Sequence, residues 1–293
     1  MEGSLPKLSS IRQDRWEVAS ADAKCSLAAA WLPIVTTLET DMRKVQTLLF
    51  GATLLALATA STHAESPPKA RNIVLVHGAF VDGSGWRSVY DILERDGYHV
   101  SVVQEPLTGL AEDIQATKRV IEQQNGPVVL VGHSYAGAII TDVGNDPKVH
   151  ALVYVAAFQP DANETIGQLT SMFAPPNNAV QSTPDGYLYV DPAKFRATIA
   201  ADIPPSEVEF LADSQQPIAA KSFATPTSTA AWHIKPSYAV LTTQDHAINP
   251  QLQRWMYQRS GAKVTEVNAS HAVFASQPAA VARVIEEAAR HSD

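Results

Sequence analysis

Cysteine is almost absent from this 293-residue chain, which contains only Cys25. A single cysteine excludes an internal disulfide framework, a cysteine-based zinc cluster and an iron–sulfur site. Basic residues are also scarce, with Lys+Arg 22 against Asp+Glu 30 and a formal net charge of -8. Because nucleic-acid-binding proteins normally carry a basic patch, this balance argues against a nucleic-acid partner. The composition, 45% hydrophobic and 18% charged, is that of a globular protein large enough to bury a core.

Long apolar runs are missing too. The run from Leu48 to Ala60 is shorter than the ~20 residues that a membrane-spanning helix needs. It follows Arg43 and Lys44 and precedes small and polar residues, so residues 42–64 have the layout of a secretory signal peptide. We therefore predict a protein exported to the periplasm or secreted, with no stable membrane insertion after processing.

The signal-like segment does not begin the chain. We interpret Met42 as the true start and residues 1–41 as an extension from a misassigned upstream start codon. The predicted mature chain then begins at Glu65 and contains no cysteine, which suits an oxidising compartment. The alternative is a genuine extension with an anchoring helix at 42–60.

Apolar, β-branched runs alternate with helical patterns in the rest of the chain. This alternation predicts an α/β fold, in which a mostly parallel sheet is flanked by helices. The alternation of strand and helix patterns is interrupted at 159–235, a segment rich in Pro, Ala, Ser and Thr with helical patches at 192–201 and 205–213. We expect a core formed by residues 65–158 and 236–293, with 159–235 inserted as a cap. The expected strands are 72–76, 99–103, 128–131, 149–155, 238–243 and 263–267.

The strand at 128–131 runs into Gly132-His133-Ser134-Tyr135-Ala136-Gly137, a G-x-S-x-G motif before a helix expected from Ser134. Glycines on either side of a serine leave room for a strained strand-to-helix turn that exposes the hydroxyl. Ser134 is therefore the candidate nucleophile, against the alternative of a chance motif on an ordinary turn. The strand at 72–76 ends in His77-Gly78-Ala79. We expect the backbone N–H groups of Ala79 and Tyr135 to form the oxyanion hole, although a simple βα turn is the alternative for the first loop.

A serine nucleophile needs a base and an acid that orients the base. His271 lies after the last expected strand, where a loop overhangs the edge of the sheet at which ligands bind, so it is the candidate base. Asp245 follows the strand before that one and gives the chain order Ser, Asp, His. Asp161 is the runner-up for the acid. His246 is expected to be a surface loop residue.

Taken together, these motifs resemble the α/β-hydrolase superfamily, and more narrowly the branch of plant methyl-salicylate-type esterases, hydroxynitrile lyases and small bacterial esterases. The resemblance covers nearly all of 72–290 and includes the Gln253-Arg254-Trp255 segment. It implies a Ser134–His271–Asp245 triad, no metal and no organic cofactor. The lyases of this branch carry a threonine and a lysine where this chain has Gly78 and Ala272, so the resemblance favours an esterase.

The expected substrate is a small to medium hydrophobic or aromatic carboxylic ester, cleaved through an acyl-enzyme. Candidate pocket residues are Phe80, Trp86, Phe158 and Trp232, each of which can equally be ordinary packing. Two alternatives are a cofactor-free haloperoxidase or perhydrolase, which uses the same triad, and a non-catalytic binding protein of the same fold. The sequence does not indicate the oligomeric state.

Overall fold

A computed structural model of the chain describes residues 68–291, which belong to one compact unit spanning 64–293. The extension predicted at 1–41 and the signal segment predicted at 42–64 lie outside the described residues. Among the helices that are described, none is both long and apolar enough to cross a membrane.

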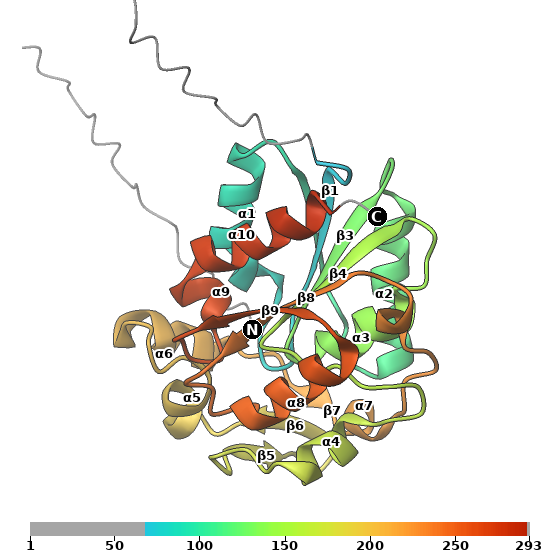
Figure 1. Ribbon diagram of the computed structural model, residues 1–293. Helices are drawn as coiled ribbons and strands as arrows, with labels where there is room; N and C mark the ends of the chain where they lie inside the picture. Colours follow the sequence, from blue (N-terminus) through green and yellow to red (C-terminus); the bar gives the residue numbers. More distant parts are fainter. Residues whose placement is uncertain (1–67, 292–293) are drawn as a thin grey trace, which may run out of the picture. The chain divides into compact units, whose positions relative to one another are not determined.

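The centre of the fold is a six-stranded parallel sheet with the strand order β2-β1-β3-β4-β8-β9 (Figure 1). The inner strands β1, β3 and β4 are almost wholly buried and consist mainly of Val, Leu and Ile, as expected of parallel strands covered on both faces. The strands are β1 (Asn72–Val76), β2 (His99–Val103), β3 (Val128–His133), β4 (Val149–Val155), β8 (Ser237–Thr242) and β9 (Lys263–Val267).

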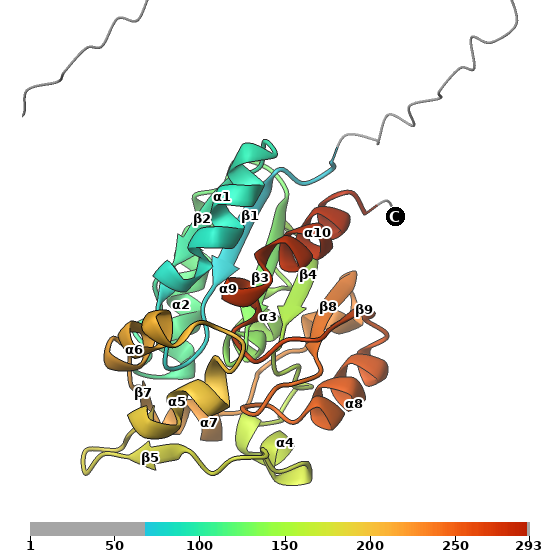
Figure 2. The same ribbon diagram turned by 90° about the vertical axis from the view of Figure 1, so that its left-hand side faces the viewer.

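Helices cover both faces of this sheet. The pair α1 (Arg87–Arg95) and α10 (Pro278–Ala289) lies on one face, and the pair α2 (Leu110–Glu122) and α3 (Ala136–Val143) lies on the other (Figures 1 and 2). The helix α8 (Pro250–Ser260) packs on β8. Short turns of helix, η1 (Gly83–Trp86) and α9 (Val273–Ser276), contact each other beside α1. This arrangement places the loops that follow β1, β3, β8 and β9 at one edge of the sheet.

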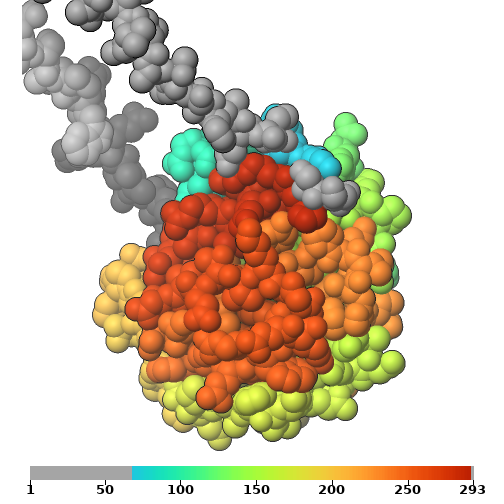
Figure 3. Space-filling model, viewed as in Figure 1, coloured from blue at the N-terminus to red at the C-terminus, as the bar shows by residue number. Residues whose placement is uncertain are grey.

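The inserted segment lies at that edge and has a small antiparallel sheet of its own, β5-β6-β7 (Figures 1 and 2). On the face shown in Figure 3, its yellow and gold surface adjoins the orange surface of the C-terminal part of the core. Its elements are α4 (Ile166–Met172), β5 (Val180–Ser182), β6 (Tyr187–Val190), α5 (Pro192–Ile199), α6 (Pro205–Asp213), β7 (Ile218–Ala219), α7 (Lys221–Ala224) and η2 (Ala231–His233).

The prediction of a mostly parallel α/β sheet flanked by helices is confirmed, and all six expected core strands are present. The cap sheet and α4 were not expected. The strands of the cap are two to four residues long, and β5 is exposed at every position, so no alternating apolar pattern marks them in the sequence. The helix expected from Ser134 instead begins at Ala136, because the backbone of Ser134 has a positive φ and so cannot belong to the helix.

Candidate active site

Ser134 occupies a strained turn between β3 and α3. Its φ is +54°, in the left-handed region that costs a non-glycine residue about 1–3 kcal/mol. The turn is held by the Ser134 N–H, which donates to Val155 O at 3.2 Å, and by the Phe158 N–H, which donates to Ser134 O at 3.1 Å. A Cβ at Gly137 would overlap the backbone oxygen of Phe158, so only glycine permits this approach of α3 to the end of β4. The backbone therefore holds Ser134 in the geometry of a nucleophile elbow.

His271 and Asp245 form a buried pair. The His271 Nδ1 atom donates to Asp245 Oδ2 at 2.8 Å, and the two side chains are 3% and 0% exposed. Because a carboxylate only accepts hydrogen bonds, Nδ1 carries the hydrogen, and in the neutral ring Nε2 keeps its lone pair. The pair is thus arranged as a base held in one tautomer by an acid.

The Asp245 carboxylate is surrounded by hydrogen-bond donors. Its Oδ1 atom accepts from the backbone N–H groups of Ala247 and Ile248 at 2.8 and 2.9 Å. Its Oδ2 atom accepts from Thr242 Oγ1 and Gln253 Nε2, both at 2.8 Å, in addition to His271. These bonds orient the carboxylate and compensate for its burial.

Asp161, the other candidate for the acid, has a different partner. Its Oδ1 atom lies 2.9 Å from His233 Nε2, in an exposed pair. The hydrogen bond to His271 comes from Asp245, so the geometry favours Asp245 as the orienting acid.

The two predicted oxyanion donors are available for binding. Among the hydrogen bonds of residues 68–291, none uses the backbone N–H of Ala79 or of Tyr135. Tyr135 is the N-cap of α3 and has helical backbone angles, which direct its N–H away from the helix. Phe80, next to Ala79, has a φ of +65°. A strained loop and a helix N-terminus thus present unpaired N–H groups on either side of the elbow.

A buried histidine and glutamate support the loop that carries Ala79. The His77 Nδ1 atom donates to Gly78 O at 2.9 Å, and His77 Nε2 lies 2.7 Å from Glu105 Oε2. Burial lowers the pKa of His77, but the hydrogen bond and charge of Glu105 outweigh burial and raise that pKa above its ordinary value. Burial in turn raises the pKa of Glu105, and His77 opposes that shift. The pair thereby holds the loop in one conformation.

A second buried carboxylate holds the other oxyanion residue. The Tyr135 hydroxyl donates to Asp113 Oδ2 at 2.8 Å, and the Leu107 N–H donates to Asp113 Oδ1 at the same distance. Burial raises the pKa of Asp113, although both hydrogen bonds favour its charged form. The tyrosine ring also stacks on Phe223, with centroids 5.8 Å apart. Tyr135 is therefore fixed at both ends, by its backbone in the elbow and by its hydroxyl on α2.

His133 supports the loop of the candidate base. Its Nε2 atom lies 3.1 Å from His271 O, and its ring packs against the rings of His271 and Phe274 with centroids 4.6 Å away in both cases. Burial, followed by the proximity of His271, lowers the pKa of His133 well below its ordinary value. His133 thus stays neutral and acts as a packing and positioning residue.

Ser134 and His271 line the same cavity, which has a volume of about 320 Å³. This volume is within the range typical of small-molecule sites. The wall is mainly apolar and is built by the core and the cap together. Its lining residues include the predicted Ala79, Phe80 and Phe158, and also Thr198, Ile199, Phe223 and His246.

The other two predicted pocket residues, Trp86 and Trp232, do not line this cavity, so their prediction as pocket residues is wrong. Trp86 is 1% exposed and packs on Phe274, with ring centroids 5.3 Å apart. Trp232 donates its indole N–H to Pro160 O at 2.8 Å, and its ring packs on His233 with centroids 3.8 Å apart. Both indoles therefore pack inside the protein. The sequence alone could not distinguish such packing from a place in the wall of the cavity.

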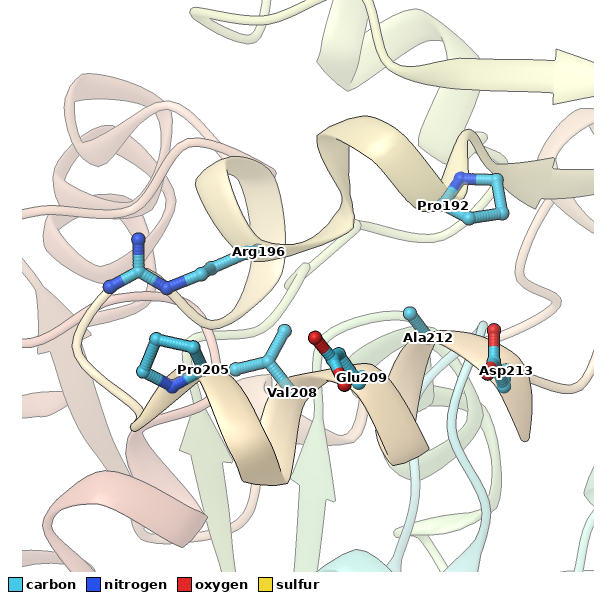
Figure 4. Close-up of a pocket in the computed structure, with 7 residues that line it drawn as sticks. All are labelled: Pro192, Arg196, Pro205, Val208, Glu209, Ala212 and Asp213. Carbon is cyan, nitrogen blue, oxygen red and sulfur yellow. The ribbon is translucent and has the colours of Figure 1, made fainter.

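A second hollow lies between α5 and α6 (Figure 4). Arg196 and Pro205 stand at one end and Pro192 and Asp213 at the other. None of the predicted site residues lines it, and no group of His, Cys, Asp and Glu within 68–291 is arranged to hold a metal ion. The chemistry-bearing residues gather in the larger cavity instead.

Two features of the site were missed from the sequence. His246, expected on the surface, lines the cavity and is half-buried. Gln253 is fully buried against Asp245, although its place in α8 gave no sign of that contact. The available signals were weak: His246 follows the acid directly, and Gln253 belongs to the Gln253-Arg254-Trp255 segment that the family resemblance includes.

Comparisons with known proteins agree with this geometry. Residues 73–284 match the family model of the alpha/beta hydrolase family. Among characterised relatives, a carbendazim hydrolyzing esterase of Nocardioides sp. is 30% identical over 124 residues, 38% of this chain and 51% of that protein. The match thus spans about half of that relative. Methylesterase 8 of Arabidopsis thaliana is 26% identical over 216 residues, 64% of this chain and 76% of the relative.

Solved structures show the same fold. A pyrethroid hydrolase from Sphingobium faniae superposes with a TM-score of 0.65 at 22% identity, over 75% of this chain and 97% of that one. Polyneuridine aldehyde esterase superposes with a TM-score of 0.62 at 18% identity, over 74% and 98% of the two chains. With its parallel sheet, its serine elbow and a family match over most of its length, this chain belongs to the alpha/beta hydrolase family.

Proposed function

We propose that this protein is a serine hydrolase that cleaves small to medium hydrophobic or aromatic carboxylic esters through an acyl-enzyme. The observation that carries the proposal is the buried Asp245–His271 pair, which opens onto the same cavity as Ser134. The similarity to a methylesterase and a carbendazim hydrolyzing esterase supports the ester as substrate class.

In the proposed mechanism each residue has a role in acyl transfer. His271 Nε2 takes the proton from Ser134 Oγ as that oxygen attacks the ester carbonyl, and Asp245 stabilises the imidazolium that forms. The free N–H groups of Ala79 and Tyr135 bind the oxyanion, which is worth about 3–4 kcal/mol per donor in comparable enzymes. His271 then protonates the leaving alcohol, and water hydrolyses the acyl-enzyme by the reverse sequence of proton transfers.

The size and lining of the cavity support the substrate class. Phe80, Phe158 and Phe223 provide flat apolar walls, and Val190 and Ile199 add aliphatic surface. Apolar groups of an ester bind such a wall because binding removes their surface from water, while the polar reacting atoms contact Ser134 and the oxyanion donors.

Ser134→Ala tests the proposal. The chain from Glu65 onward is assayed with 4-nitrophenyl acetate, butyrate and octanoate, and the variant should lose turnover by on the order of 10⁶-fold in kcat. Ser237→Ala, at the start of β8 and outside the cavity, is the matched control and should retain the activity of the wild type. Turnover that survives in folded Ser134→Ala protein would refute the mechanism. The ranking of the three chain lengths measures the room available to the acyl group.

A further inference from the structure

The loop of the candidate base is bound on both sides of His271 by one segment of the cap. Before the base, the Ser270 N–H donates to Asp202 Oδ2 at 3.1 Å, and the Ser270 hydroxyl donates to Asp202 Oδ1. After the base, the Ala272 N–H donates to Ile199 O at 2.8 Å. Both acceptors belong to the end of α5 and the turn that follows it. The cap therefore fixes the backbone of the base at two neighbouring points.

The loop of the candidate acid is bound by the same segment of the cap. His246, which directly follows Asp245, has its Nδ1 atom 2.9 Å from Ala197 O. Because a carbonyl oxygen only accepts, Nδ1 is the donor. Ala197 lies two residues before the Ile199 that accepts from the base loop. In each of these contacts the cap accepts and a catalytic loop donates, so residues 197–202 join the two loops that carry the acid and the base.

Asp202 is the side-chain acceptor in this set, since the other acceptors are backbone oxygens. Asp202 is exposed, whereas Ser270, the residue that it binds, is only 1% exposed. Burial acts to raise the pKa of Asp202, but the two hydrogen bonds from Ser270 outweigh burial and lower that pKa below its ordinary value. The acceptor is thus an ionised carboxylate, which binds a donor more strongly than a neutral acceptor does.

We propose that Asp202 is a positioning residue of this hydrolase, which acts from the cap by binding Ser270 and so keeps the His271 imidazole within reach of Ser134. Asp202 does not line the cavity, so it is not expected to touch a bound substrate. Its effect passes through the backbone of the base loop. This inference rests on the proposed esterase function and adds that the seating of the cap on the core regulates the catalytic base.

The first test compares Asp202→Ala with Asp213→Ala and measures kcat and KM separately on 4-nitrophenyl butyrate. Asp213 is exposed at the end of α6 in the same cap (Figure 4), and none of the hydrogen bonds or ion pairs found within residues 68–291 involves its side chain. In Asp202→Ala the bond from Ala272 to Ile199 remains. A 1 Å misplacement can cost about 10²-fold, so we expect a smaller loss of about tenfold in kcat, with KM within about twofold. Asp213→Ala should keep both constants.

Asp202→Asn separates this positioning role from the removal of a charge. The asparagine oxygen can accept from the Ser270 N–H while its NH₂ group donates to the Ser270 hydroxyl, whose hydrogen then turns to Ile199 O, 3.2 Å away. Both contacts are kept without the charge, so kcat should return to within about threefold of the wild type.

Ser270→Ala tests the same contact from the other side. It removes the hydroxyl and keeps the N–H, so it should lower kcat less than Asp202→Ala does. In the double variant the two losses should not multiply, because the residues share one contact. Thermal melting of each variant checks the fold. If Asp202→Ala does not fold, Ser270→Ala decides in its place, since a lower kcat at constant KM supports the role and an unchanged kcat overturns it.

Each remaining outcome has a distinct meaning. Folded Asp202→Ala with the kcat of the wild type, a loss confined to KM, or an equal loss in Asp213→Ala would overturn the positioning role and leave the esterase proposal standing. Losses that multiply in the double variant would do the same. Absence of turnover by the wild type on every ester would overturn the proposed function, and the positioning role with it.

Discussion

Asp245→Asn is a demanding test of the proposed chemistry, because every group that contacts the Asp245 carboxylate is placed as a donor. The backbone N–H groups of Ala247 and Ile248 point at Oδ1, and His271, Thr242 and Gln253 point at Oδ2. The amide of asparagine has one accepting and one donating end, so either orientation sets its NH₂ group against donors.

The consequences for activity and stability can be estimated separately. If the NH₂ group faces His271, the imidazole must take its other tautomer, which places the hydrogen on Nε2 and removes the base; in a serine protease the same change costs about 10⁴-fold. If it faces the backbone N–H groups, two buried donors lose their acceptor. Replacing these charge-assisted bonds should lower the free energy of unfolding by about 3 kcal/mol.

The assay measures kcat/KM on 4-nitrophenyl butyrate and the free energy of unfolding in urea. We expect Asp245→Asn to lose about 10⁴-fold in kcat/KM. Asp161→Asn is the control: Asp161 was the rival candidate for the acid, and its partner is the exposed His233. It should change kcat/KM by less than about twofold. Activity of Asp245→Asn within tenfold of the wild type, or an equal loss in Asp161→Asn, would refute the assignment of the acid.

Three further outcomes are expected. Glu105 raises the pKa of His77 above its unfolded value, so the contribution of His77 to stability is complete below about pH 6.5 and is lost as the pH rises through the folded-state pKa. Urea unfolding at several pH values should show that the free energy of unfolding falls more steeply with rising pH in the wild type than in His77→Gln. Gly137→Ala should destabilise the fold by about 3 kcal/mol through overlap with a backbone oxygen, while Gly167→Ala, whose Cβ meets nothing closer than 3.4 Å, should melt at or above the wild-type temperature. Tyr135→Phe removes a donor from a buried carboxylate and should lower kcat several-fold with little change in KM, which steady-state kinetics would show; an unchanged kcat would remove its hydroxyl from any positioning role.

The sequence alone determined the features that depend on local patterns. Continuous apolar runs predicted the core strands, because a strand buried on both faces must be apolar at every position. The glycines around Ser134 predicted the strained turn, because only a residue without a side chain allows the close approach seen at Gly137. The choice of Ser134, Asp245 and His271 as candidates also followed from local features, because each residue comes after the end of an expected strand.

The tertiary structure decided which distant residues meet. The choice between Asp245 and Asp161 depends on which loop reaches His271, and that is set by the pairing of β8 with β4 and β9. The exclusion of Trp86 and Trp232 from the cavity, and the hydrogen bond of His246 to the backbone oxygen of Ala197, likewise depend on how the cap packs on the core. No local periodicity encodes such contacts, since they join side chains that lie far apart in the chain and are specified only by the packing of whole elements.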